Sequence, residues 1–243
     1  MYKEAQFYMI AVAVLTLTFA FAAIYNPATD DGRALSGEIT RGLALIPIVL
    51  YGLYVFVQYQ DTLEHVGEID TRDIRPAREW LRLAGSLVLI VAGVEALVRA
   101  AVNFGDIFEH PSFLWGVTVV AAGTSVPDAF VSVRAARAGR GITSIANVLG
   151  SNVFDLLVCI PAGVLVAGAA VIDFAVAAPM MGVLTAATVV LFLAMRTRMV
   201  LSRWESASLL VIYGTFVVWI TAETFGAIDL VPALPPAATA PAH

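Results

Sequence analysis

Two short stretches, "GTSVPDAF" at residues 123–130 and "LGSNVFDLL" at residues 149–157, each place an aspartate inside an apolar segment. These aspartates are Asp128 and Asp155. A carboxylate in the hydrocarbon core of a membrane costs at least about 2.5–3.5 kcal/mol, so a membrane helix carries one only where the charge finds a partner. The chemistry of that partner therefore indicates what the protein does.

The composition is that of a membrane protein. Of the 243 residues, 60% are apolar and 14% are charged, whereas a typical soluble domain is about a quarter charged. The mean hydropathy is +0.86. The net charge of −5 and the pI near 5.1 argue against nucleic acid as a partner. The sequence therefore predicts an integral membrane protein, with the lipid bilayer as a partner.

Seven apolar segments are long enough to cross about 30 Å of hydrocarbon. The predicted spans are 5–25, 42–58, 83–103, 112–136, 142–168, 174–195 and 205–224. The second span is short and contains Pro47, so its bounds are the least sharply defined. This pattern predicts an all-α membrane protein with about seven transmembrane helices.

Basic residues outside the spans are strongly biased to one side of the membrane. The opposite side carries only Arg33 and Arg41 among several acidic residues. The positive-inside rule then places the N-terminus in the cytoplasm and the C-terminus outside. Residues 59–80 are then predicted to form a charged cytoplasmic loop with a short amphipathic helix near "REWLRL". Residues 227–243 are predicted to form a Pro/Ala-rich tail. The eleven basic residues on the cytoplasmic side are Lys3, Arg72, Arg75, Arg78, Arg82, Arg134, Arg137, Arg140, Arg196, Arg198 and Arg203.

A weak internal repeat links the two ends of the chain. The stretch "IVLYGLYVFV" at 48–57 resembles "LLVIYGTFVVW" at 209–219, and each lies in the second helix of a predicted hairpin. By the distribution of basic residues, the two hairpins cross the membrane in opposite directions. An inverted-topology repeat of this kind is common in transporters; chance similarity between apolar helices is the alternative.

The two aspartates are predicted to lie near the middle of the bilayer. The arginine-rich turn at 134–140 marks the membrane surface, with Asp128 about ten residues before it and Asp155 about fifteen after it. At 1.5 Å per residue, both carboxylates reach the centre of the membrane on adjacent antiparallel helices. Pro127 has no N–H, so the carbonyl of Gly123 loses its helical partner and the helix is predicted to open there.

Hydroxyl groups accompany each carboxylate. Thr124 and Ser125 precede Asp128 by four and three residues, and Ser151 precedes Asp155 by four. These spacings place each set on one helix face. Hydroxyl, carboxylate and carbonyl oxygens are hard ligands, which suit Ca²⁺ or Na⁺ rather than Zn²⁺ or copper. Beside Ser151, Gly150 is expected to permit close backbone approach. The alternatives are structural: a simple proline kink in the first stretch and a small-residue packing face in "GSN".

Two further charges lie within a span, four residues apart on one helix. These are Glu95 and Arg99. Arg99 is near enough to the outer surface for its side chain to reach the interface. A local ion pair is the favoured interpretation for these two residues.

The motifs "GTSVPD" and "NVLGSNVFD" resemble the second α-repeat of the Na⁺/Ca²⁺ exchanger superfamily of cation/Ca²⁺ antiporters. That family has ten membrane helices in two inverted halves of five, so the resemblance implies that 81–226 forms a second half. Residues 1–58 would then be the two-helix hairpin that ends a first half. An aspartate at both acidic positions makes the motifs most similar to the K⁺-dependent exchangers.

The resemblance also implies a set of cation ligands. By motif position, Thr124, Ser125 and Asp128 would bind the cation from one helix, and Ser151 and Asp155 from the other. The backbone carbonyl of Ala121 would be an additional ligand. The transported ions would be Ca²⁺ and Na⁺, with K⁺ as a further candidate, and no cofactor is expected.

The chain departs from the family pattern in one respect. No second "GTS-x-P" or "GSN" motif occurs in residues 1–80. The first α-repeat, which forms the opposite wall of the site in the family, is therefore expected from elsewhere. It would come from another subunit, from an N-terminal extension or from a second copy of the chain.

Three functional hypotheses follow. The first is a subunit or fragment of a plasma-membrane antiporter that exchanges Ca²⁺ for Na⁺ by alternating access. The second is a truncated or regulatory half-exchanger without transport activity of its own. The third is an intramembrane aspartyl protease, in which two carboxylates share a proton and activate water. The hydroxyl groups beside each aspartate favour a cation site over a protease dyad, so the chain is not expected to be an enzyme.

Overall fold

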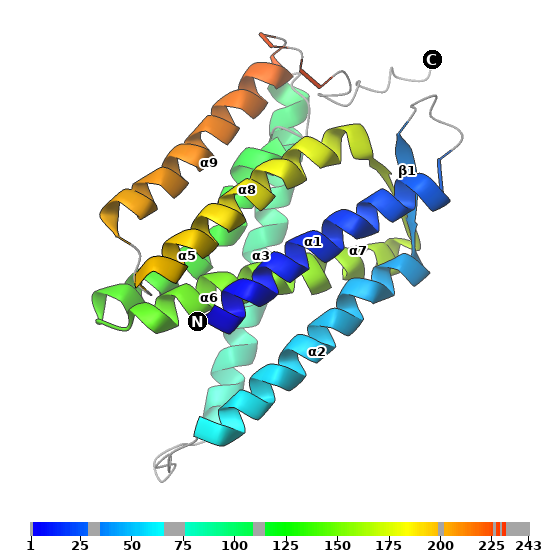
Figure 1. The fold of residues 1–243 in the computed structure, drawn as a ribbon. Helices are drawn as coiled ribbons and strands as arrows, with labels where there is room; N and C mark the ends of the chain where they lie inside the picture. Colours follow the sequence, from blue (N-terminus) through cyan, green and yellow to red (C-terminus); the bar gives the residue numbers. More distant parts are fainter. Residues whose placement is uncertain are drawn as a thin grey trace. The chain divides into compact units, whose positions relative to one another are not determined.

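A computed structural model describes residues 2–28, 35–65, 76–108, 115–198, 202–225, 227–228 and 230–231, most of them in long helices (Figure 1). It falls into two compact units. One comprises residues 1–56 and 128–234, and the other comprises 57–127 and 235–243. The elements in chain order are α1 (Tyr2–Tyr25), β1 (Ser36–Thr40), α2 (Arg41–His65), α3 (Pro76–Phe108), η1 (Gly116–Val120), α5 (Ala121–Arg137), α6 (Gly141–Phe154), η2 (Asp155–Cys159), α7 (Ile160–Ala167), β2 (Ala169–Asp173), α8 (Phe174–Arg198) and α9 (Arg203–Thr224).

The prediction of an all-α membrane protein is confirmed. Six helical segments of the described chain are long and apolar enough to cross a membrane. The predicted span at 112–136 is not among them. The structure describes this part of the chain as η1 followed directly by α5, and 112–114 lie outside the described residues. The six segments are Lys3–Tyr25, Arg41–Leu63, Pro76–Gly105, Gly141–Ala167, Phe174–Arg196 and Arg203–Thr224.

Two helices extend well beyond their predicted spans. Helix α2 continues to His65, and α3 begins at Pro76 and runs for 33 residues. The segment "REWLRL" is therefore the first part of α3 rather than a separate short helix. Proline is well tolerated at the start of a helix, which explains where α3 begins. Of the predicted loop at 59–80, only 66–75 lie outside the described residues.

A small antiparallel sheet is the feature that the sequence analysis missed. Strand β1 pairs with β2, with Ser36 opposite Asp173 and Thr40 opposite Ala169. Gly37 lies against the backbone of α1, where an added Cβ would collide with Ala22 and Ala23. Glycine at this position therefore lets β1 pack directly on α1.

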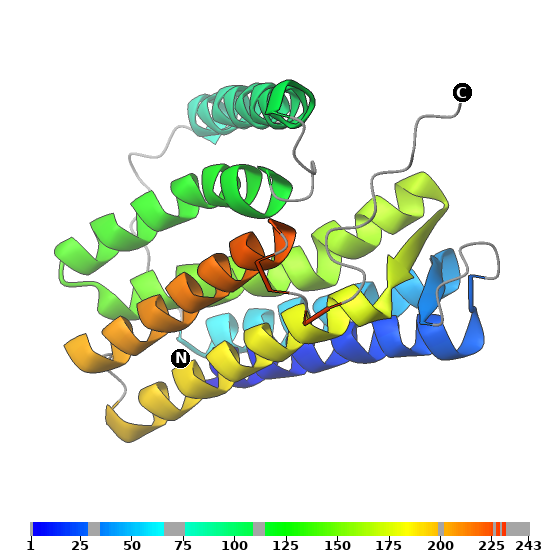
Figure 2. The ribbon, with the colours of Figure 1, turned by 90° about the horizontal axis from the view of Figure 1, so that it is seen from above.

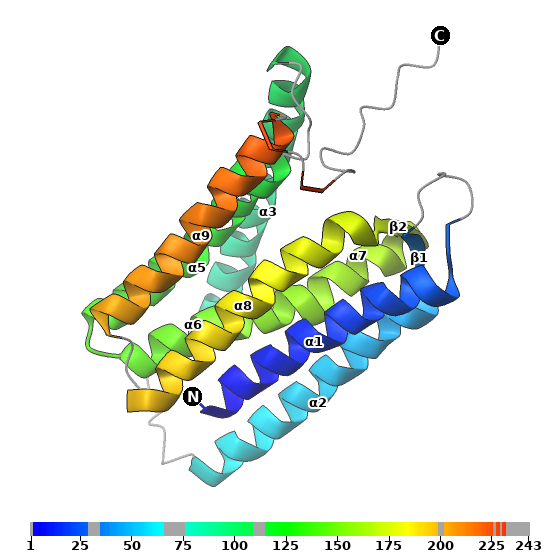
Figure 3. The same cartoon turned by 45° about the horizontal axis from the view of Figure 1, so that its top comes forward.

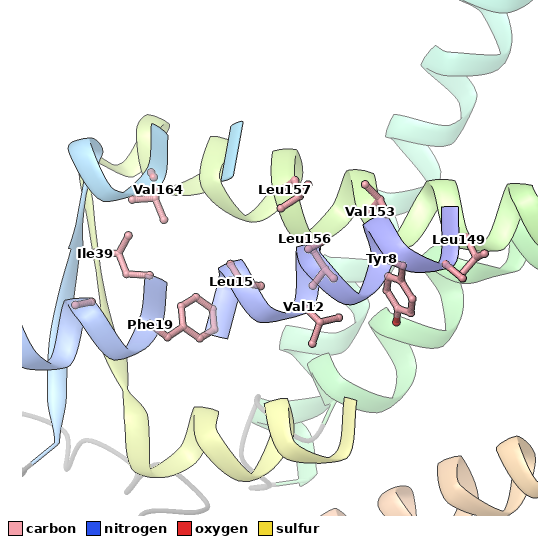
Figure 4. Close-up of a cluster of buried hydrophobic side chains, with 14 of the residues drawn as sticks. Tyr8, Val12, Leu15, Phe19, Ile39, Leu149, Val153, Leu156, Leu157 and Val164 are labelled. Carbon is pink, nitrogen blue, oxygen red and sulfur yellow. The ribbon is translucent and has the colours of Figure 1, made fainter. Parts of the chain in front are cut away.

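Helix α1 forms the centre of the larger unit. It packs along α8, as Figure 2 shows from above, and also against α6, η2 and β1. Helix α2 approaches the same helix, with Phe7 and Tyr54 in edge-to-face contact at 5.2 Å between ring centroids (Figure 3). Figure 4 shows the resulting core, in which α1 side chains meet those of α6, η2 and α7. Its labelled members are Tyr8, Val12, Leu15, Phe19, Ile39, Leu149, Val153, Leu156, Leu157 and Val164.

These contacts establish the relative direction of the segments in this unit. The stretch from Gly141 to Ala167 is helical over 27 residues, which corresponds to about 40 Å. The turn before Gly141 and the strand β2 after Ala167 therefore lie at opposite ends of the unit. Because β1 pairs with β2, residues 36–40 lie at the end opposite to the turn at 138–140.

This arrangement leads to a labelling prediction. In a Cys159→Ala background, Glu38→Cys and Ala138→Cys should react with an impermeant thiol reagent from opposite sides of the membrane, since both residues are exposed. With the basic turn in the cytoplasm, Glu38→Cys should be labelled in intact cells and Ala138→Cys only after permeabilisation. The reverse pattern would invert the proposed orientation, and labelling of both variants from one side would contradict the helix directions themselves.

In the smaller unit, α3 packs on η1. Arg99 donates from Nε to Oε1 of Glu95 at 2.8 Å, so the predicted local ion pair is confirmed. A Cβ on Gly123 would meet the side chain of Leu97 on α3, which indicates that glycine allows the start of α5 to approach α3 closely.

The end of α9 is held by a buried carboxylate. Glu223 is 1% exposed, and its Oε1 accepts hydrogen bonds from the backbone N–H groups of Leu230 and Val231 at 2.8 and 2.7 Å. Val231 is the first residue of the stretch "VPALPPAATAPAH" within the predicted tail, and it is buried. Residues 232–243 lie outside the described residues.

Candidate cation site

The first predicted ligand helix is α5, which is continuous through Pro127. The helix does not open at the proline, contrary to the expectation from sequence, because one missing amide leaves the hydrogen bonds on either side intact. The irregular backbone lies earlier, in the wide π-helical turn η1, where the N–H of Ala121 reaches back to the carbonyl of Gly116. Such turns are frequent at functional sites.

The hydroxyl groups of α5 are accessible. Thr124 Oγ1 donates to the carbonyls of Val120 and Ala121 at 3.0 and 3.1 Å. The lone pairs of this oxygen therefore remain available to a cation. Thr124 and Ser125 are both exposed, as is Ala121, whose carbonyl is the remaining predicted ligand of this helix. These three residues belong to the smaller unit, whereas Asp128 on the same helix belongs to the larger.

The second aspartate begins a π-helical turn. In η2 the N–H of Ile160 donates to the carbonyl of Asp155, five residues back. Pro161 follows at once and cannot donate to the carbonyl of Leu157, which explains why the regular helix gives way here. Leu156 and Leu157 are buried, while Asp155 is exposed. The turn thus directs the carboxylate away from the apolar core.

Asn147 connects the two ligand helices and was not singled out by the sequence analysis. Its Nδ2 donates to Ser132 Oγ at 3.1 Å and to the carbonyl of Asp128 at 3.4 Å. Ser151 and Asp155 follow Asn147 at intervals of four residues. At 100° per residue, the three side chains fall within about 80° of arc on one face. Asn147 faces α5 at Asp128 and Ser132, and Ser151 and Asp155 lie on the same face of the continuous α6–η2 segment. This four-residue spacing is the signal that could have identified Asn147.

The general tilt of helical side chains favours a closer approach of the two carboxylates. Asp155 lies eight residues beyond Asn147, or about 12 Å along the axis. A side chain on a helix tilts toward the N-terminus of that helix. Helices α5 and α6 are joined by a tight turn and run in opposite directions. The tilt therefore shifts the side chain of Asp128 along the axis toward the level of Ser151, and it shifts the side chain of Asp155 toward the same level from the other side.

Gly150 does not have the role expected of it. The nearest heavy atom to a Cβ built there is the Tyr54 hydroxyl at 4.0 Å, an ordinary contact distance, so close backbone approach does not require glycine here. The neighbouring contact between α2 and α6 is aromatic, with the rings of Tyr51 and Phe154 5.6 Å apart and edge to face.

The donor set of this region consists of oxygens. Ser151 Oγ donates to the carbonyl of Val148 at 3.1 Å, which leaves its lone pairs available. Across the residues that the structure describes, no three His, Cys, Asp or Glu side chains gather closely enough to hold a metal ion. A cation bound here would therefore depend on hydroxyl and carbonyl oxygens beside the two carboxylates, which suits Ca²⁺ and Na⁺.

Comparison with known proteins agrees with this chemistry. Residues 79–222 match the family described as sodium/calcium exchanger protein. The chain belongs to the sodium/calcium exchanger family. Its members are transporters rather than enzymes, so the prediction that the chain is not an enzyme is confirmed and the protease hypothesis is wrong. No solved structure matches the chain significantly.

Three relatives illustrate the similarity. The sodium/calcium exchanger MaX1 of Methanosarcina acetivorans is 30% identical over 144 residues, which cover 58% of this chain and 40% of the relative. The human sodium/potassium/calcium exchanger 5 is 43% identical over 72 residues, which cover 30% of this chain and 14% of the relative. CaxA of Alkalimonas amylolytica is 35% identical over 185 residues, which cover 76% of this chain and 56% of the relative.

The chain thus spans less than two thirds of the length of each of these relatives. Proteins named as sodium/potassium/calcium exchangers from human and Drosophila melanogaster are among the relatives. The resemblance of the motifs to the K⁺-dependent type is therefore confirmed.

The Asn147 bridge leads to a second prediction. Asn147→Ala removes both hydrogen bonds to α5 and leaves the buried Ser132 hydroxyl without this donor, at a cost of about 1–3 kcal/mol. The melting temperature should fall, and Ca²⁺ binding should weaken because the two ligand helices are no longer held together. Asn152→Ala is the matched control, since Asn152 Nδ2 bonds only to the Val148 carbonyl of its own helix in the described residues. Equal effects of the two substitutions on Ca²⁺ binding would contradict the bridging role.

Proposed function

We propose that the chain is a subunit or fragment of a plasma-membrane antiporter that exchanges Ca²⁺ for Na⁺, with K⁺ as a further candidate ion and without a cofactor. Family membership supports a cation exchanger. The observation that carries the proposal is the pair of aspartates on two helices joined by Asn147, each with hydroxyl oxygens one turn away.

In this proposal the cation is bound by residues of both ligand helices. The α5 ligands are Thr124, Ser125 and Asp128, with the Ala121 carbonyl. The α6–η2 ligands are Ser151 and Asp155. Two carboxylates balance the charge of one Ca²⁺, or that of Na⁺ ions that replace it. Loss of Ca²⁺ binding on replacing either aspartate by asparagine is the experiment that tests this assignment.

We further propose that a second α-repeat segment completes the site. Ca²⁺ takes six to eight oxygen ligands. Thr124, Ser125 and Asp155 are exposed in the described chain, and an unpaired carboxylate facing lipid is costly. Another subunit, an N-terminal extension or a second copy could supply the opposite wall. A second copy would need to cross the membrane in the opposite orientation. The strong bias of basic residues toward one side opposes such an orientation.

The proposed orientation places the N-terminus and the turn at 134–140 in the cytoplasm and the C-terminus outside. It rests on the basic residues counted in the sequence.

A further inference from the structure

The turn between α5 and α6 encloses a hollow outside the cation site. Its volume is about 310 Å³. It is lined by Phe130, Val131, Arg134, Ala135, Arg140 and Thr143. All six residues belong to the larger unit. The surface of the hollow is almost entirely apolar, and two arginines and a threonine are among the residues that form it.

A helix-terminating turn brings the two arginines to one place. The N–H of Arg140 donates to the carbonyl of Ala135 at 2.9 Å, and that of Gly139 donates to the carbonyl of Ala136 at 3.0 Å. This is the Schellman pattern, which needs a residue with positive φ. Gly139 supplies it, with φ of 75°. The turn folds Arg140 back over the last turn of α5, where Arg134 lies.

The two arginines beside the hollow have no acidic partner in the described part of the chain. Among the residues that the structure describes, neither Arg134 nor Arg140 forms an ion pair. Arginine presents planar N–H donors that match phosphate oxygens. Helix α6 also begins at this hollow without a side-chain cap, so its first N–H groups add to the positive potential.

Two large apolar residues of the lining are exposed. Phe130 is 65% exposed and Val131 is 49% exposed, and both lie about two turns before the end of α5. A helix end at the membrane surface places such side chains beside acyl chains and the arginines at the level of the headgroups. A free anion would contact only the two arginines, whereas a lipid would contact both the arginines and the apolar surface of the hollow.

We propose that this hollow binds an anionic phospholipid, with the phosphate held by Arg134 and Arg140 and an acyl chain along Phe130 and Val131. Basic pockets at helix ends on the cytoplasmic side are suited to such headgroups. The bound lipid would neutralise the turn that joins the two ligand helices. This proposal concerns a different site from the cation ligands and stands independently of the transported ion.

Native mass spectrometry of the purified chain tests the proposal. The detergent micelles would contain equal amounts of phosphatidylglycerol and phosphatidylcholine with the same acyl chains. We expect the chain to retain phosphatidylglycerol preferentially and the double variant Arg134→Gln/Arg140→Gln to lose this preference by about tenfold, since each basic residue contributes several-fold. Only the backbone of these two residues enters the turn, so the variant should remain folded.

Arg137→Gln is the matched control, because Arg137 lies on the same turn and carries the same charge but does not line the hollow. It should retain the preference. Thr143→Glu, which adds a negative charge to the hollow, should abolish it by an independent route. Unchanged preference in the double variant and in Thr143→Glu would overturn the proposal, as would an equal loss in Arg137→Gln. Displacement of the lipid by inorganic phosphate in excess would show a site for free anions instead and would also overturn it.

Discussion

Replacement of Asp128 or Asp155 by asparagine is expected to weaken Ca²⁺ binding by about a hundredfold or more, because a dry cation site that loses one of two carboxylates loses several kcal/mol of attraction. Asparagine keeps the size of the side chain and one carbonyl oxygen, so the fold should persist. Equilibrium binding of ⁴⁵Ca²⁺ to the purified variants, with Na⁺ as the competitor, measures the effect. Ser151→Ala removes a neutral ligand, and its effect should be clearly smaller.

Glu95→Gln is the matched control for this experiment. Glu95 is also a carboxylate within a long apolar helix, but its Oε1 is engaged by Arg99 four residues along the same helix. Its neutralisation should leave Ca²⁺ affinity unchanged. Wild-type Ca²⁺ affinity in both aspartate variants would contradict the proposed site. An equal loss of affinity in Glu95→Gln would show that the loss follows from removing any negative charge in the protein rather than a ligand.

A second large effect is expected in reconstitution. The 243-residue chain alone, in liposomes with an imposed Na⁺ gradient, should show no ⁴⁵Ca²⁺ uptake above that of protein-free vesicles. The ligand helices offer three hydroxyls, two carboxylates and a backbone carbonyl, and the alternating access of such transporters requires a second repeat to rock against the first. Uptake should appear when the part of MaX1 outside the 144 matched residues is reconstituted together with the chain.

The number of chains per vesicle separates the possible partners. Uptake in vesicles that contain a single copy would contradict the requirement for a partner. Uptake that appears only with several copies of this chain, and without any other protein, would identify a second copy as the partner. It would exclude a first α-repeat supplied by another subunit or by an N-terminal extension. Neither result would alter the aspartate assignment, which rests on binding alone.

Local patterns in the sequence were sufficient for much of this protein. The apolar runs located the helices, since about 20 apolar residues in a row have few alternatives to a membrane span. The Glu95–Arg99 pair followed from a four-residue spacing, because such neighbours meet on any helix. The assignment of the two aspartate motifs to one family likewise required only the order of residues along the chain.

Other features depend on contacts between distant segments. The pairing of β1 with β2 joins residues more than a hundred positions apart. The packing of α1 between α6–η2 and α8 uses Ala, Val and Leu side chains that occur in every span, so hydrophobicity alone does not select the partner. Asn147 is one polar residue among several in its helix, and only the position of α5 gives it a role.

By itself, then, the sequence determined the membrane class, the helices and the pair of acidic motifs, because each depends on residues within a few turns of one another. The tertiary structure decided where the helices are irregular and which faces meet. Pro127 left α5 continuous, whereas Pro161 follows a π-helical turn that begins at Asp155. The same residue type has different outcomes because a lost backbone hydrogen bond can be absorbed in different ways.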